Sequence, residues 1–151
     1  MVLMLLGMSS TALIAQDFKI QTGIVEFNQQ NYKDAIEAFD TGLSDVAGLK
    51  EKNVVKGYYY RGMSRMQYMK QIAGKAAQGI ELEAEEESAM ETIIPDAYRD
   101  LTNARKYDTG KMTEKIDKGL AQVSQLLLQG SLAALNSTLG NELKAEEKAE
   151  A

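Results

Sequence analysis

Residues 23–43 read GIVEFNQQNYKDAIEAFDTGL and contain two short apolar patterns separated by the polar residues NQQN. In the second pattern the apolar positions recur three and four residues apart, as on one face of an α-helix: Tyr32, Ala35, Ile36, Phe39 and Leu43. The first pattern has helical spacing too, in Phe18, Gly23, Ile24 and Phe27. This stretch therefore predicts two short helices joined by a polar turn.

The rest of the chain carries the same periodicity. It predicts helices over 51–72, from Pro95 in a first turn to about residue 106, and over 112–139. Residues 73–91, with two glycines and an acidic run at 81–87, predict a solvated insertion that is helical in its second half. Residues 141–151 predict a charged, flexible tail. Because no stretch alternates at period two for long, we expect an all-α domain over 16–140.

The composition excludes several functions. A length of 151 residues, 44% apolar and 26% charged, suits one soluble domain. The net charge of −5 argues against binding nucleic acid through phosphate neutralisation. With no Cys and no His, the chain lacks thiol nucleophiles, disulfides, Cys or His zinc sites and imidazole-based triads. The single proline favours long helices joined by short turns.

The first fifteen residues, MVLMLLGMSSTALIA, carry no charge and end in small residues. At about 1.5 Å of rise per residue they are too short for a hydrocarbon core of roughly 30 Å. An apolar segment of this kind is typical of a secretory signal peptide, so we expect residues 1–15 to be removed and no stable membrane span to remain. The alternative is the buried first helix of a cytoplasmic bundle.

The segment 23–43 resembles a tetratricopeptide repeat, a family in which a helix hairpin recurs about every 34 residues. Gly23 occupies the small position of the first helix, and Tyr32 the aromatic position that opens the second. Ala35, Phe39 and Gly42 match the small, aromatic and last small positions of the second helix. The resemblance implies that the helices approach closely, so a larger side chain at Gly23 or Ala35 would push the hairpin apart.

A second, split repeat follows. Tyr58 and Gly62 match positions of a first helix, and Ala97, Leu101 and Ala104 match positions of a second. The resemblance covers residues 17–108, with an insertion of about 25 residues where the family has a short turn. It implies antiparallel hairpins in a right-handed superhelix with a long C-terminal capping helix. Two repeats are fewer than such arrays usually need, so that helix or self-association must cover the core.

The resemblance also implies a binding site, because proteins of this family hold partners in a concave groove lined by the first helix of each hairpin. The positions carried over are Asp17, Ile20, Ile24, Phe27, Asn28, Lys56, Tyr59, Met63, Met66 and Gln67. We predict that five of them contact a protein or peptide partner: Asn28, Tyr59, Met63, Met66 and Gln67. Tyrosine and flexible methionine suit a groove for apolar segments.

Alternatives stay open at several of these residues. Phe27, Met63 and Met66 would equally suit a plain core. Ile20 and Ile24 occupy the positions where some relatives clamp a C-terminal carboxylate, which disfavours a receptor for chaperone tails.

Two clusters also allow more than one interpretation. Tyr58, Tyr59 and Tyr60 point three ways around a helix, so at least one should be exposed or at an interface. The acidic run at 81–87 could collect calcium but lacks the spacing of a calcium loop, so a solvated helix face is the preferred interpretation. We predict no catalytic residue, no cofactor and no metal site.

These observations predict a non-enzymatic interaction module. The resemblance and the export signal place it in a bacterial envelope, in the periplasm, or outside the cell. One alternative is a structural or assembly subunit of the envelope that self-associates through the C-terminal helix, with Leu127 and Leu135 at the interface. Another is an enzyme with a carboxylate-based site.

Overall fold

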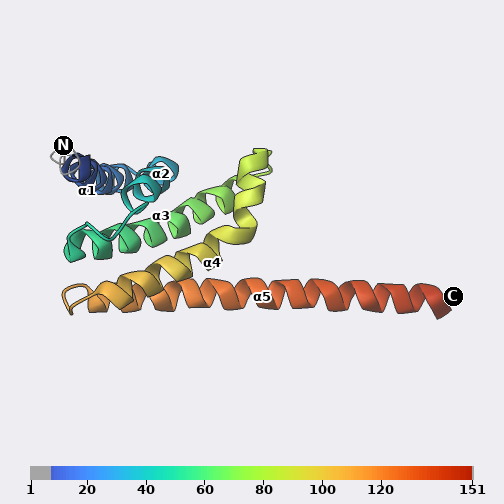
Figure 1. Cartoon of the computed structure of the whole chain (residues 1–151). Helices are drawn as coiled ribbons and strands as arrows, with labels where there is room; N and C mark the ends of the chain where they lie inside the picture. The colour runs from blue at the N-terminus through green and yellow to red at the C-terminus, as the bar shows by residue number, and fades with distance from the viewer. Residues whose placement is uncertain (1–7, 151) are drawn as a thin grey trace, which may run out of the picture.

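The computed structural model describes the backbone of residues 8–150 and the side chains of residues 15–138. This part of the chain forms five helices and contains no strand. The helices are α1 (Met8–Asn28), α2 (Tyr32–Gly42), α3 (Glu51–Ala77), α4 (Ala84–Tyr107) and α5 (Thr113–Glu150). Figure 1 shows α3, α4 and α5 running back and forth as successive antiparallel helices. The prediction of an all-α fold with packed helix hairpins is confirmed.

Helices α1 and α2 form the first hairpin, with a turn in which Gln30 takes a left-handed backbone conformation with φ of 65°. Gly23 lies against the buried ring of Phe39, where an added Cβ would come within 2.7 Å of the ring. Gly42 lies equally close to α1, where a Cβ would come within 2.7 Å of Ile20. These contacts run in opposite order along the two helices, so the helices are antiparallel and glycine sets their separation.

Helices α3 and α4 form the second hairpin and repeat the same kind of contact. A Cβ on Gly62 would lie 3.0 Å from Cγ of Leu101 and 3.1 Å from the carbonyl oxygen of Ala97. About one turn of α3 farther from the connecting turn, the rings of Tyr58 and Tyr107 stack with their centroids 6.0 Å apart. Both hairpins therefore place a glycine of the first helix against a large apolar residue of the second.

The segment 73–91 differs from its prediction as an insertion. Helix α3 continues to Ala77 and α4 begins at Ala84, so six residues separate them and most of the segment extends the two helices. The carboxylate of Glu86 accepts a hydrogen bond of 3.1 Å from the backbone N–H of Glu83, which caps the first turn of α4. Because this cap begins the helix, the prediction that it starts at Pro95 is wrong.

Pro95 instead lies inside α4. A proline there removes one backbone hydrogen bond and bends the helix. Figure 1 shows the first turns of α4, in yellow-green, at a marked angle to the remainder. The bent part approaches α2, where Lys33 and Glu85 form an ion pair of 2.7 Å.

The first helix buries a different side chain from the one expected. Phe18, predicted on its apolar face, is 68% exposed. Ile20 is fully buried instead, packed with Ala35, Phe39 and Leu43. Ile20 therefore belongs to the interior of the first hairpin.

A buried ion cluster joins the two hairpins. Nε and Nη2 of Arg61 donate to the two carboxylate oxygens of Asp100 at 3.0 and 2.6 Å, and Nη1 of Arg61 donates to Asp40 at 2.7 Å. Arg65 also donates to Asp100, which is 1% exposed. Burial lowers the pKa of Arg61, but the hydrogen bonds and charges of Asp100 and Asp40 outweigh burial and raise it. The cluster ties α2, α3 and α4 together.

Helix α5 covers α4 with its first half. Gly119 lies against Leu101, and Ile116 and Val123 are fully buried. From residue 128 to residue 138 every position is exposed, and Figure 1 shows this end of α5 projecting beyond the other helices. The backbone of α5 continues as helix to Glu150, through the segment predicted as a flexible tail, whose side chains lie outside the described residues.

The predicted signal peptide is described only in part. Residues 1–7 lie outside the described residues, and α1 runs without a break from Met8 through Ala15. In the portion of the chain that could be searched, no helix has an apolar stretch long enough to span a bilayer.

Candidate functional site

A pocket of about 390 Å³ lies where the end of α1 meets α3 and the first half of α5. Helix α1 contributes Phe27 and Asn28. Helices α3 and α5 contribute the remaining residues: Tyr59, Tyr60, Met63, Lys115, Lys118, Gly119 and Gln122.

The packing of the helices explains why these residues meet. Helix α1 lies beside α3, and Asn53 donates a hydrogen bond of 2.7 Å to Asp17 between them. Helix α5 approaches closely at Gly119, where an added Cβ would lie 3.2 Å from Leu101 and 3.4 Å from Sδ of Met63. A larger residue at position 119 would push α5 away and widen the pocket.

Aromatic rings form one wall of this pocket. The centroids of Phe27 and Tyr60 lie 5.2 Å apart, and those of Tyr59 and Tyr60 lie 5.1 Å apart, both edge to face. Burial raises the pKa of the Tyr59 phenol, and neighbouring Tyr60 raises it further. The phenol of Tyr59 therefore stays protonated at neutral pH and can donate a hydrogen bond to a ligand.

A second pocket of about 220 Å³ continues the first along α3 and α5, and Gln122 lines both. Its lining is Met66, Lys70, Gln122, Gln125, Leu126 and Gln129. We call the two pockets together the α3–α5 groove.

The charge of the α3–α5 groove differs from that of the whole chain. Its lining includes Lys70, Lys115 and Lys118 and no Asp or Glu, whereas the chain has a net charge of −5. The Nζ of Lys118 pairs with Glu114 at 2.8 Å, but both side chains are more than 70% exposed, so this pair is weak and easily exchanged.

The five predicted contact residues fall into three groups. Asn28, Tyr59 and Met63 line the first pocket together. Met66 borders the second pocket but is 1% exposed and packs mainly in the core. Gln67 is half-buried and lines neither pocket.

Sequence reasoning missed the α5 wall of the groove. Lys115, Lys118, Gln122, Gln125 and Gln129 recur three and four residues apart, a polar stripe that the sequence already contains. That stripe indicates a solvated helix face, and only the packing of α5 beside α3 makes it one side of a groove.

The tyrosine run contributes to both the groove and the packing. None of the three is fully buried, and Tyr59 and Tyr60 line the first pocket. Tyr58 stacks on Tyr107 instead. The three tyrosines thus divide between a pocket wall and a helix contact, as their spacing around the helix requires.

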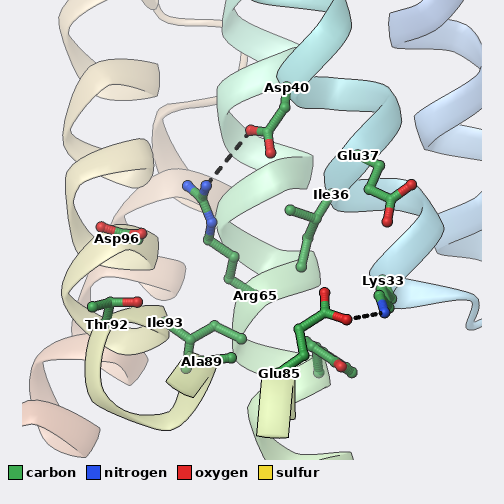
Figure 2. Close-up of a pocket in the computed structure, with 11 residues that line it drawn as sticks. Lys33, Ile36, Glu37, Asp40, Arg65, Glu85, Ala89, Thr92, Ile93 and Asp96 are labelled. Carbon is green, nitrogen blue, oxygen red and sulfur yellow. Dashed lines mark hydrogen bonds and ion pairs between the residues drawn. The ribbon is translucent and has the colours of Figure 1, made fainter. Parts of the chain in front are cut away.

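Another pocket of about 240 Å³ lies on a different face of α3, between α2 and α4 (Figure 2). Both basic groups of its lining lie close to acids of the same lining, because Lys33 pairs with Glu85 at 2.7 Å and Arg65 lies 3.6 Å from Asp40. Figure 2 shows both interactions as dashed lines between residues that line this pocket. The α3–α5 groove is the better candidate because its lysines face no acid in the lining.

Among the residues that the structure describes, no group of three or more Asp or Glu side chains gathers closely enough to hold a metal ion. In the acidic run, Glu85 pairs with Lys33, and Glu86 pairs with Lys75 and caps α4.

The chain matches no protein-family model, no curated protein and no solved structure.

Proposed function

We propose that this chain is a non-enzymatic module that holds an extended, acidic segment of a partner protein in the α3–α5 groove. The observation that carries the proposal is the lining of the groove: aromatic rings and three lysines, with no carboxylate, on a chain of net charge −5. A tetratricopeptide-like arrangement of the hairpins, proposed from the repeated glycine contact, supports the same conclusion.

The chemistry of the groove supports an extended occupant. An extended peptide leaves backbone N–H and C=O groups unpaired. Gln122, Gln125 and Gln129 follow one another along α5, and each side-chain amide can both donate and accept. A row of amides can therefore pair with the backbone of a bound segment.

The groove offers two kinds of surface to the side chains of the partner, one aromatic and one positively charged. Tyr59, Tyr60 and Phe27 offer rigid aromatic surface for an apolar side chain. Lys115 and Lys118 attract carboxylates nearby. We further propose a location in the bacterial envelope or outside the cell, which the apolar N-terminal segment and the resemblance to tetratricopeptide repeats support.

A peptide library displayed on phage tests the proposal. We expect the protein to enrich peptides in which Asp or Glu lies near Leu, Phe or another apolar residue. Tyr59→Ala and Lys118→Glu should each weaken binding of an enriched peptide by about tenfold or more, measured by fluorescence polarisation. Binding to the wild-type protein should also weaken as salt increases.

Matched controls use residues outside the groove. Tyr98→Ala removes a 43%-exposed tyrosine of α4, and Lys106→Glu reverses an exposed charge at the end of α4. Both should leave the affinity unchanged. The proposal fails if no acidic peptide is enriched, or if the groove variants bind the enriched peptide as tightly as the controls do.

A further inference from the structure

A third pocket, of about 610 Å³, continues the α3–α5 groove toward the projecting end of α5. It shares Leu126 and Gln129 with the second pocket of the groove. Its volume falls within the range of roughly 300–1,000 Å³ that ligand pockets have. We call it the α4–α5 pocket. Apolar side chains of three helices make up most of the rest of its lining: Met69, Met90, Ile94, Leu127, Ala133 and Ala134.

The bend in α4 explains why this space stays open. Pro95 lines the pocket, and the part of α4 before it turns toward α2, where Lys33 pairs with Glu85 at 2.7 Å. Figure 1 shows these first turns of α4 leading away from α5, which continues straight past the bend. Leu127, which the self-association alternative places at an interface, instead packs against the core of its own chain and lines this pocket.

The charge of the lining reverses between the α3–α5 groove and the α4–α5 pocket. The groove is lined by three lysines and no acid, whereas the α4–α5 pocket is lined by Glu91 and no Lys or Arg. A carboxylate of a ligand is therefore attracted to the groove and repelled near Glu91. The apolar lining of the pocket also offers no partner to a buried charge. The three pockets thus form a row with a positively charged part and an apolar end.

We propose that the α4–α5 pocket holds an apolar side chain of the same partner segment whose acidic residues contact the lysines of the groove. This inference rests on the proposed function and adds a spacing to it. Lys118 and Gly130 are separated by about 18 Å along α5, at about 1.5 Å per residue. An extended segment covers that distance with five or six residues. The recognised segment therefore carries an acidic residue and a large apolar residue five or six positions apart.

Gly130 provides a way to fill the pocket by mutation. No atom lies within 4 Å of the point where its Cβ would be, so a larger side chain can start there without a clash. Gly130→Phe should therefore occupy the α4–α5 pocket and leave the helices in place. Gly74→Phe is the matched control, because Gly74 is also a helical glycine with open space at its Cβ and lines none of the three pockets. Circular dichroism should show unchanged helix content in both variants.

Three labelled synthetic peptides test the spacing on the full chain by fluorescence polarisation. All begin with Leu-Glu-Glu for the groove. The first continues with five serines and Phe, the second with five serines and Ala, and the third with one serine and Phe. The first should bind about tenfold or more tightly than the other two, because only its Phe reaches and buries itself in the α4–α5 pocket.

The variants separate this inference from the proposed function. Gly130→Phe should reduce the affinity for the first peptide to that for the second and leave the second unchanged, whereas Gly74→Phe should change neither. Equal binding of the three peptides overturns the inference alone if Tyr59→Ala and Lys118→Glu still weaken all of them. A gain from Phe that persists in Gly130→Phe also overturns it and leaves the pocket to another occupant, such as a lipid chain. Failure of every peptide to bind overturns both proposals.

Photo-crosslinking locates the apolar residue of the ligand directly. The first peptide, with 4-benzoylphenylalanine in place of Phe, should attach to residues of the α4–α5 pocket such as Met69 or Met90. Proteolysis and mass spectrometry identify the attachment site. Attachment to the aromatic wall of the groove, at Phe27 or Tyr59, would overturn the assignment of the apolar residue to the α4–α5 pocket.

Discussion

Gly23 and Gly74 both lie inside helices, but only Gly23 has a close neighbour where a side chain would be. A Cβ on Gly23 would come within 2.7 Å of the Phe39 ring, whereas nothing lies within 4 Å of the corresponding point at Gly74. The same residue type therefore has two roles: Gly23 permits a close helix contact, and Gly74 only lowers helix propensity.

Replacing each glycine with alanine separates these roles. Gly23→Ala should lower the free energy of unfolding by about 1–2 kcal/mol, because overpacking against Phe39 exceeds the gain in helix propensity. Gly74→Ala should raise it by about 0.5–1 kcal/mol. Urea denaturation measures both, and equal stabilisation by the two substitutions would contradict the close contact at Gly23.

The sequence predicts that Gly23 and Phe39 belong to one helix hairpin, because the two residues lie close together along the chain. The repeat pattern predicts a close approach at Gly23 and Ala35, and the structure places the ring of Phe39 against Gly23. The apolar spacing predicts Phe18 on the buried face of the first helix, but Phe18 is exposed and Ile20 is buried. Both residues fit an apolar helix face, and only the position of α2 decides which one is covered.

At the scale of elements, the sequence predicted which helices exist better than where they end. The single proline predicts a helix start, because proline is common in first turns. Glu86, within the acidic run, provides the actual start by accepting the N–H of Glu83 and pairing with Lys75. This cap depends on Lys75 of another helix, which spacing alone does not reveal.

The cap of α4 predicts a dependence of stability on pH. The hydrogen bond from Lys75 and then that from the backbone of Glu83 lower the pKa of Glu86 below 4.5. The folded state therefore binds fewer protons than the unfolded state just below that pH, so this stabilisation is complete above pH 4.5 and is lost as pH falls through the folded-state pKa.

Glu86→Gln should remove part of that pH dependence. The variant should unfold at a lower urea concentration than the wild type at neutral pH. The difference between the two urea midpoints should become smaller as the pH is lowered. Glu87→Gln is the matched control, because Glu87 is an exposed neighbour on the same turn. A gap that stays constant down to pH 3 would contradict this role for Glu86.

At the scale of the whole molecule, the ion cluster around Asp100 joins helices that are distant in sequence. Asp100 binds Arg61 and Arg65 of α3, and Arg61 also binds Asp40 of α2. Arg61 and Asp100 are 39 residues apart, and each fits a solvated helix face when considered alone. Spacing along the sequence therefore does not predict this cluster, and it does not predict that the polar stripe of α5 lies beside α3.

Removing the central carboxylate should destabilise the protein strongly. Asp100→Asn should lower the free energy of unfolding by about 3 kcal/mol, because two largely buried guanidinium groups would lose their main partner. Glu114→Gln, which breaks the exposed pair with Lys118, should change it by less than about 0.5 kcal/mol. Similar effects of the two substitutions, measured by urea denaturation, would contradict a structural role for the buried cluster.

The length of α5 also sets a distance. Lys115 in the first pocket and Gln129 in the second are separated by about 20 Å along the helix, at about 1.5 Å per residue. An extended segment needs about six residues to cover that distance. The proposed groove would therefore favour ligands of at least this length, because a shorter segment could contact only one of the two pockets.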